Sequence, residues 1–153
     1  MKIVTAEGER DMEAARRLFQ AYETELGISL CFQGFAAELA TLPGAYVPPR
    51  GRLLLAKAAG AAVGCVALRP LVDGVAEMKR LYLAPGVRGK GVGRRLVEHA
   101  LAEARDIGYC HVRLETFATM SAANALYDAL GFKRIHAYYD NPLPGAIYKE
   151  IDL

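Results

Sequence analysis

Glycines and basic side chains gather between residues 88 and 95, in the string RGKGVGRR that follows an apolar segment. Three glycines within five positions let the backbone turn tightly, so several N–H groups can point into one concavity. A helix that begins here adds the positive end of its dipole. The basic residues are Arg88, Lys90, Arg94 and Arg95. Together these features predict a site for a phosphate or pyrophosphate group.

The glycine spacing does not match the two common nucleotide-binding loops. A dinucleotide fold needs GxGxxG and an acidic residue about 20 positions later, and a P-loop needs GxxxxGK[ST]. The string in this chain is RxxGxG, over residues 88–93. Phosphoryl transfer would also need acidic residues beside the loop to hold Mg²⁺, whereas this loop is wholly basic. A phosphoryl-transfer enzyme is therefore not expected.

Apolar periodicity predicts an α/β protein around this loop. The expected strands are 3–5, 53–57, 62–68, 75–83, 109–116, 132–135 and 147–151, and the expected helices are 11–26, 35–40, 92–106 and one that Thr119 or Ser121 caps and Gly131 ends. Turns at Gly60 and Gly74 make the strands between 53 and 83 an antiparallel meander. The strand–helix–strand order makes 109–116 parallel to 75–83, which gives a mixed sheet.

Length and composition fit one globular domain over residues 1–153, which can bury about 70% of its unfolded surface without a metal or disulfide. The chain is 53% hydrophobic and 24% charged with a net charge of +2, so no nucleic-acid partner is expected. The longest uncharged stretch near the middle, 58–68, is too short to cross a bilayer, so no membrane partner is expected. Cys31, Cys65 and Cys110 lack CxxC spacing, so we expect buried thiols and a cytoplasmic location.

Two blocks of the sequence resemble motifs of the GNAT superfamily of N-acetyltransferases. RxxGxG and the strand before it resemble the coenzyme A pyrophosphate loop, and N-x-x-Y-x-x-x-G-F at 124–132 is similar to the NxxxxYxxxGF helix in loosened form. The stretches 77–82 and 139–146 look like those of a bacterial subgroup whose acceptors are mostly unassigned. The resemblance covers nearly the whole chain and implies a GNAT-type fold. That fold is a mixed, mostly antiparallel sheet with one parallel strand pair splayed at the acetyl-CoA site, and helices on both faces.

The same resemblance implies acetyl-CoA as the donor. The strand before the loop would offer backbone groups to the pantetheine arm, the loop amides would hold the pyrophosphate, and an asparagine would help to hold the pantetheine. In this chain those residues are Leu81, Tyr82, Leu83, Arg88, Gly89, Lys90, Gly91, Val92, Gly93, Arg94 and Asn124.

Transfer to an amine would need a base and an acid, because an amine is mostly protonated at neutral pH and the departing thiolate benefits from a proton donor. Glu77 lies in a strand expected to be central, where a carboxylate is unusual. Its offset from RxxGxG resembles that of the family's general base, which would act directly or through a water. Alternatively, Glu77 pairs with Lys79 on the same face of the strand. Tyr127, three residues after Asn124, would be the acid; alternatively it packs between helix and sheet with its hydroxyl bonded to a backbone carbonyl.

The resulting hypothesis is an acetyl-CoA-dependent N-acetyltransferase working by direct attack of a primary amine, since no Ser-His or Cys-His arrangement suggests an acyl-enzyme. The alternative is a non-catalytic acyl-CoA-binding regulatory module of the same fold. His99, His111 and His136 have no metal-ligand spacing, so no metal is expected.

The loop 138–145 is the expected acceptor site. Tyr138, Tyr139, Asp140 and Asn141 offer aromatic surface, a negative charge and an amide, and two prolines stiffen the loop. Alternatively the loop packs on itself or on a second subunit of a homodimer. The sequence leaves the acceptor open among a polyamine, an amino acid, an aminoglycoside-like drug and a protein amine.

Overall fold

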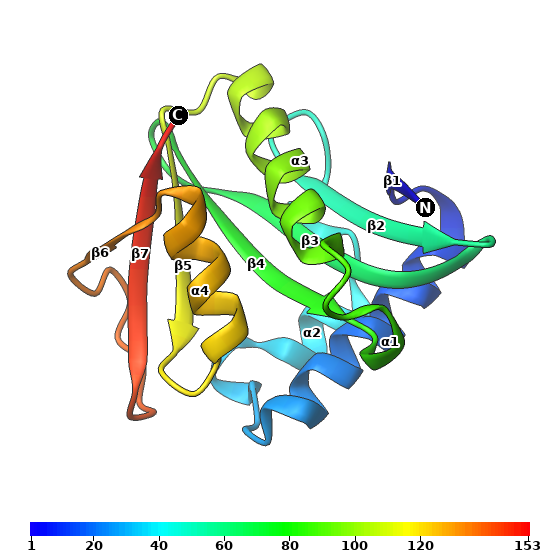
Figure 1. The fold of residues 1–153 in the computed structure, drawn as a ribbon, viewed down its shortest axis with the longest axis horizontal. Helices are drawn as coiled ribbons and strands as arrows, with labels where there is room; N and C mark the ends of the chain where they lie inside the picture. Colours follow the sequence, from blue (N-terminus) through cyan, green and yellow to red (C-terminus); the bar gives the residue numbers. More distant parts are fainter.

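A seven-stranded sheet forms the centre of the protein, described here from a computed structural model of residues 1–153 (Figure 1). The strands are β1 (Lys2–Thr5), β2 (Arg52–Ala58), β3 (Ala61–Val72), β4 (Val75–Leu83), β5 (His111–Phe117), β6 (Lys133–Ile135) and β7 (Ala146–Asp152). The helices are α1 (Gly8–Leu26), α2 (Phe35–Ala40), α3 (Val92–Ile107) and α4 (Ser121–Leu130). The order across the sheet is β1-β2-β3-β4-β5-β7-β6, and only the pair β4–β5 is parallel. The predicted mixed sheet is confirmed.

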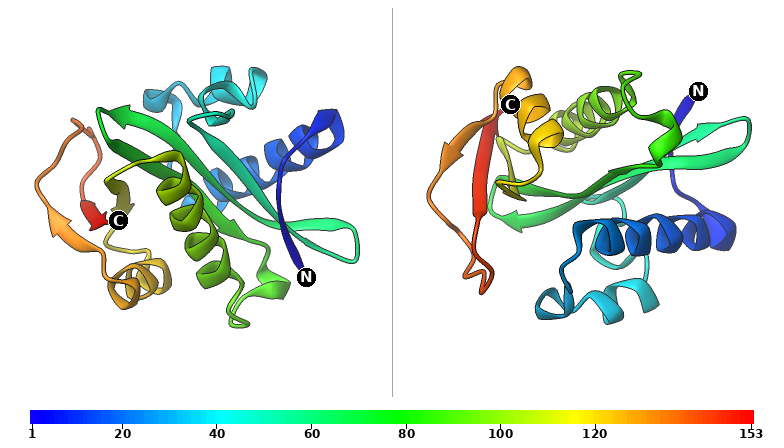
Figure 2. Two further views of the ribbon diagram at one scale, coloured as in Figure 1. Left: turned by 90° about the horizontal axis from the view of Figure 1, so that it is seen from above. Right: turned by 60° about the horizontal axis from the view of Figure 1, so that its bottom comes forward.

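Helices cover both faces of this sheet, with α1 and α2 on one face and α3 and α4 on the other (Figure 2). Successive side chains of β2 alternate between the two layers: Leu53 and Leu55 pack toward α1, and Leu54 and Ala56 pack toward α3. The apolar stripe expected on α3 is buried against the sheet, and it consists of Val92, Leu96, Val97, Ala100, Leu101 and Ala104. None of the helices has the length and apolar character that crossing a bilayer requires.

The start of α4 differs from the sequence prediction. The helix is capped at Met120, and neither Thr119 nor Ser121 supplies a capping side chain. Asn124 fixes the start instead, because its Nδ2 donates to the carbonyl of Phe117, the last residue of β5, at 2.9 Å.

The prediction of three buried thiols is wrong for two of them. Cys65 is buried in β3, but Cys31 and Cys110 are exposed. Cys31 begins a short 3₁₀ turn after α1, and Cys110 lies between α3 and β5, so neither belongs to a core-facing row of a long element.

The parallel strands β4 and β5 run side by side for only three residue pairs, from Val75–His111 to Glu77–Arg113. Beyond that point residues 78–83 and 114–117 have no partner on the other strand, which confirms the predicted splay. The backbone of β4 therefore presents unpaired groups toward the gap.

A second irregularity lies in β4 opposite β3. Arg80 has φ of 61°, in the left-handed region that non-glycine residues rarely occupy. The register with β3 shifts there, between Cys65–Tyr82 and Ala67–Lys79. Because of this bulge, Lys79 and Arg80 both project toward the α1 face, whereas Leu81 packs toward α3.

The guanidinium of Arg80 is held by α2. It donates to the two carboxylate oxygens of Glu38 at 2.8 and 3.0 Å and lies 5.2 Å from the ring centre of Phe35. Its side chain is 3% exposed. Burial alone would raise the pKa of Glu38, but the hydrogen bonds and charge of Arg80 outweigh burial and lower it. This bidentate pair connects α2 to the bulge.

Candidate active site

Two cavities and a small space between them lie along the end of β4. The first, named here the loop groove, has a volume of about 780 Å³ and is bounded by the end of α1, residues 81–83, the glycine loop and residues 119–123. The second, named here the charged pocket, has a volume of about 460 Å³ and lies under α2 and the turn that precedes it. Its six charged residues are Glu38, Arg69, Glu77, Lys79, Arg80 and Glu115.

The glycine loop offers a run of unpaired amides. The backbone N–H groups of residues 89–94 donate no backbone hydrogen bond, and the first helical bond of α3 runs from Arg95 to Gly91. Gly91 has φ of 80° and precedes the helix, and a Cβ on Gly93 would lie 3.4 Å from the Leu83 side chain. This backbone fits a phosphate or pyrophosphate group.

The predicted donor residues divide into two groups. Those that line the loop groove are Leu81, Tyr82, Leu83, Arg88, Gly89 and Gly93. Those that do not are Lys90, Gly91, Val92, Arg94 and Asn124. Val92 is 3% exposed because it belongs to the core stripe of α3, so only its amide can serve a ligand. The Oδ1 atom of Asn124 is buried without a hydrogen-bond partner.

An ion pair crosses the loop groove. Arg88 donates to the carboxylate of Glu25 on α1 at 2.6 Å and to the carbonyl of Leu83 at 2.8 Å. The Tyr82 hydroxyl donates to the same carboxylate at 3.1 Å. The hydrogen bond from Arg88 lowers the pKa of Glu25, which stays negative at neutral pH. Because both side chains are about half exposed, the pair is weak and an anionic ligand can displace Glu25.

In the charged pocket both oxygens of Glu77 are engaged. Oε1 accepts from Arg69 Nε at 2.8 Å and Oε2 accepts from the Tyr138 hydroxyl at 2.8 Å. Arg69 is the cross-strand neighbour of Glu77 on β3, and it takes the place that sequence reasoning considered for Lys79. Burial and the charge of Glu77 raise the pKa of Tyr138, so its phenol keeps its proton and donates.

The loop 138–145 covers the charged pocket. Tyr138 reaches Glu77, and Asn141 donates from Nδ2 to Glu115 Oε1 at 3.0 Å. The ring of Tyr139 stacks on Phe32, with 6.5 Å between ring centres. Asp140 is exposed and forms no ion pair. Three of the four predicted acceptor residues thus meet at the site, and Asp140 does not.

A space of about 20 Å³ shares lining residues with both cavities, and we name it the junction cavity. It lies where β4 and β5 separate, and its lining includes Tyr22, Leu81, Glu115 and Tyr127. Tyr22 also lines both larger cavities, Leu81 lines the loop groove and Glu115 lines the charged pocket. The volume is enough for one water molecule or an ammonium group.

Tyr127 and Glu115 are the polar groups of interest at this junction. Tyr127 is 5% exposed and packs edge-on against Phe132 at 5.6 Å, and burial raises its pKa. No hydrogen bond joins its hydroxyl to a backbone carbonyl. Glu115 Oε2 is buried without a partner. Glu115 was not among the predicted site residues, although it is a carboxylate in a central strand, the same signal that singled out Glu77.

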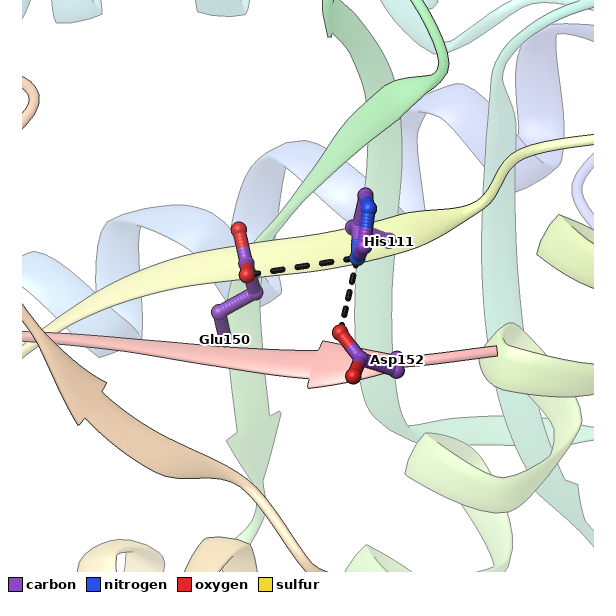
Figure 3. Close-up of side chains that lie close together, drawn as sticks. All are labelled: His111, Glu150 and Asp152. Carbon is purple, nitrogen blue, oxygen red and sulfur yellow. Dashed lines mark hydrogen bonds and ion pairs between the residues drawn. The ribbon is translucent and has the colours of Figure 1, made fainter.

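A third group of charged residues lies outside both cavities, where β5 begins beside the end of β7 (Figure 3). His111 Nδ1 is 2.8 Å from Asp152 Oδ1 and 3.9 Å from Glu150 Oε1. Glu150 also accepts from Arg113 at 2.6 Å. These ion pairs account for the arrangement, and the Arg113 charge opposes binding of a cation at Glu150.

The chain is similar to known acetyltransferases. The model of the acetyltransferase (GNAT) family matches residues 12–132. An uncharacterized N-acetyltransferase from Schizosaccharomyces pombe is 38% identical over 146 residues, covering 94% of this chain and 90% of that protein. A GNAT-family acetyltransferase structure from Staphylococcus aureus has a TM-score of 0.82 at 16% identity, covering 99% of this chain and 98% of that one. An aminoglycoside 6'-N-acetyltransferase complexed with coenzyme A has a TM-score of 0.75 at 14% identity, with 99% and 97% covered. At these identities the two structures show a shared fold.

Glu25→Gln should strengthen the binding of coenzyme A at the loop groove by about two- to fivefold, because the carboxylate that competes for Arg88 is removed from an exposed ion pair. Isothermal titration calorimetry at low salt measures the change, and the gain should shrink in 1 M salt. Asp106→Asn, an exposed acid at the far end of α3, serves as the control with equal loss of charge. Unchanged or weaker binding in Glu25→Gln would contradict the competition.

Proposed function

The chain belongs to the GNAT family of acetyltransferases, and on this premise we propose that it transfers the acetyl group of acetyl-CoA to the primary amine of a small molecule by direct attack. The observation that carries the proposal is the meeting of two cavities at the gap between β4 and β5. One cavity begins at a run of free amides and the other is lined by carboxylates. A donor and an acceptor bound in them would come together at the junction cavity.

On the donor side, acetyl-CoA supplies the thioester whose carbonyl carbon the amine attacks. The amides of residues 89–94 would hold its pyrophosphate, with Arg88 released from Glu25 and Arg94 at the helix start. The unpaired backbone of residues 81–83 would bind the pantetheine arm, which reaches from the loop to the junction. Asn124 Oδ1, buried without a donor, would suit an amide N–H of that arm.

Two carboxylates are candidates for the base. Glu77 is the base predicted from the sequence and remains a candidate. Arg69 and Tyr138 already engage its two oxygens, however, and it does not line the junction cavity. Glu115 lines that cavity and has a free oxygen. We assign proton removal to Glu115, directly or through one water molecule, and to Glu77 the positioning of Tyr138 and Arg69.

On the leaving-group side, Tyr127 would donate to the departing sulfur. Burial raises its pKa above the usual range, so the phenol keeps its proton at neutral pH. It lines the junction cavity together with Leu81 and Glu115. A base and a donor at one small cavity support direct transfer.

A regulatory module that only binds acyl-CoA is the alternative. Such a module would need the loop groove alone. The charged pocket, which the loop 138–145 contacts, favours an enzyme because it provides a place for a second substrate.

Acetyl-CoA should bind with measurable heat, and incubation with a panel of amines should release one thiol for each amine acetylated. Gly91→Val should weaken donor binding, because a β-branched residue disfavours the φ of 80° that shapes the loop. Gly60→Val is the matched control, since Gly60 has φ of 82° in the β2–β3 turn and lines none of the three cavities. No heat at millimolar acetyl-CoA, or thiol release without an acetylated amine, would contradict the proposal.

Glu115→Gln should lower kcat by about 10²–10⁴-fold and remove the acidic limb of the pH–rate profile, because the proton acceptor is lost. Glu77→Gln should keep the shape of that profile and act mainly on the acceptor KM, since the orientation of Tyr138 and Arg69 changes. Stopped-flow or steady-state thiol detection across pH separates the two. If the profile changes only in Glu77→Gln, the base is Glu77.

Tyr127→Phe should lower kcat by about tenfold or more with little change in melting temperature, because the ring packing on Phe132 remains and only the hydroxyl is lost. Tyr109→Phe is the matched control. Its buried hydroxyl donates to the Arg50 carbonyl at 2.8 Å outside the site, so that variant should lose stability and keep its turnover. A stability loss without a kcat change in Tyr127→Phe would assign it a packing role.

A further inference from the structure

Resting on the proposed function, we infer that the acceptor is a small zwitterion, an amino-acid-like molecule whose reacting amine is held by Glu115 and whose carboxylate is held by Lys79. This selects one class among amines that a general acetyltransferase site could take. The inference depends on which charges in the charged pocket already have partners.

Four of the six charged side chains in the pocket are paired with each other. Arg69 bonds to Glu77 at 2.8 Å, and Arg80 bonds to Glu38 at 2.8 Å with a second bond at 3.0 Å. The two left over are Lys79 and Glu115, which form no ion pair with any residue. One free cation and one free anion in the same cavity are complementary to a ligand that carries both charges.

One oxygen of Glu115 has no hydrogen-bond donor. Oε1 of Glu115 accepts from Asn141 at 3.0 Å and from Gln33 Nε2 at 3.4 Å, while Oε2 is buried and free. Since Gln33 turns its NH₂ group toward this carboxylate, its own Oε1 faces elsewhere and is also buried and free. An ammonium group has three donors and no acceptor, so it suits the free oxygen of Glu115. Glu115 borders the junction cavity, where the amine would react, and Lys79 borders it as well.

Lys79 forms no ion pair with the acids around it. Lys79 stands next to Arg80 because of the bulge, and Glu38, the nearest acid on α2, is committed to Arg80. Burial and the neighbouring Arg80 lower the pKa of Lys79, and the charges of Glu77 and Glu38, which act in the opposite direction, do not offset them. A carboxylate of the ligand would supply a counter-ion.

The charge balance of the pocket argues against a polyamine, and its size suits a small molecule. Three acids and three bases give a formal charge of zero, so a polyamine would bring uncompensated positive charge. The volume of about 460 Å³ lies in the range for small molecules. The stacked rings of Phe32 and Tyr139 close one side over it. A free amino acid or a similar molecule fits these limits.

The experiment compares each of the twenty protein amino acids with its own methyl ester, and with putrescine and a short peptide, as acceptors for acetyl-CoA. The ester keeps the amine and removes the carboxylate charge. Because more of its amine is unprotonated at neutral pH, the ester is the better nucleophile, so a preference for the free acid must come from binding of the carboxylate. The best acceptor should be a free amino acid, with kcat/KM at least about tenfold above its ester. Equal or better transfer to the ester, to putrescine or to the peptide alone would overturn the inference and leave the proposed function standing.

Lys79→Met should reduce the acid-to-ester ratio of kcat/KM by about 10- to 100-fold, and Lys79→Arg should retain most of it, because the charge is kept. Lys133→Met, on the exposed strand β6, is the control of equal size and should leave the ratio unchanged. Calorimetry with acetyl-CoA checks that each variant is folded. An unchanged ratio in Lys79→Met would overturn the role of Lys79. No acetylation of any amine by the wild type would instead defeat the proposed function, and this inference with it.

Discussion

The left-handed backbone at Arg80, held by the bidentate bond to Glu38, is the constraint on which the site depends. A non-glycine residue in this region costs on the order of 1–2 kcal/mol, and the buried guanidinium would be costly without its carboxylate, so neither feature is stable without the other. The bulge changes which face of β4 each side chain occupies. Met78, before the bulge, and Leu81, after it, both pack in the α3 layer. They are three positions apart, whereas the regular alternation of a strand would separate them by two or four. Lys79 and Arg80 can therefore both face α1 while Leu81 faces the groove.

Much of the donor side can be predicted from the sequence because its signals are local. The glycines fix the backbone of the loop, the helix that follows is marked by its apolar stripe, and strand–helix–strand connectivity fixes the parallel pair. Periodicity also gives the bounds of α2 and β4, whereas α1 begins three residues earlier and β3 ends four residues later than expected. The start of α4 and the exposure of Cys31 and Cys110 could not be predicted, because they depend on side-chain contacts and packing that periodicity does not report.

The acceptor side could be predicted only in part, because its partners are chosen by register and by loops far away in sequence. Arg69 rather than Lys79 pairs with Glu77 because the β3–β4 register sets them opposite each other, and that register includes a bulge at a residue with no turn preference. Glu115 becomes a site residue only because β5 separates from β4 next to it and because Asn141 arrives from a loop 26 positions later. A carboxylate in a strand is visible in the sequence, but whether one of its oxygens lacks a hydrogen-bond partner depends on the tertiary structure.

The last turns of α1 form a wall shared by every cavity of the site, since Tyr22 lines all three and Glu25 lies across the loop groove. A ligand that draws Arg88 away from Glu25 acts on the same stretch of helix that borders the space for the other ligand. If a ligand in one cavity shifts this stretch of helix, thermodynamic linkage requires that each substrate change the affinity for the other by the same factor. Cooperativity between donor and acceptor binding would then originate in one helix end and not in the reacting groups.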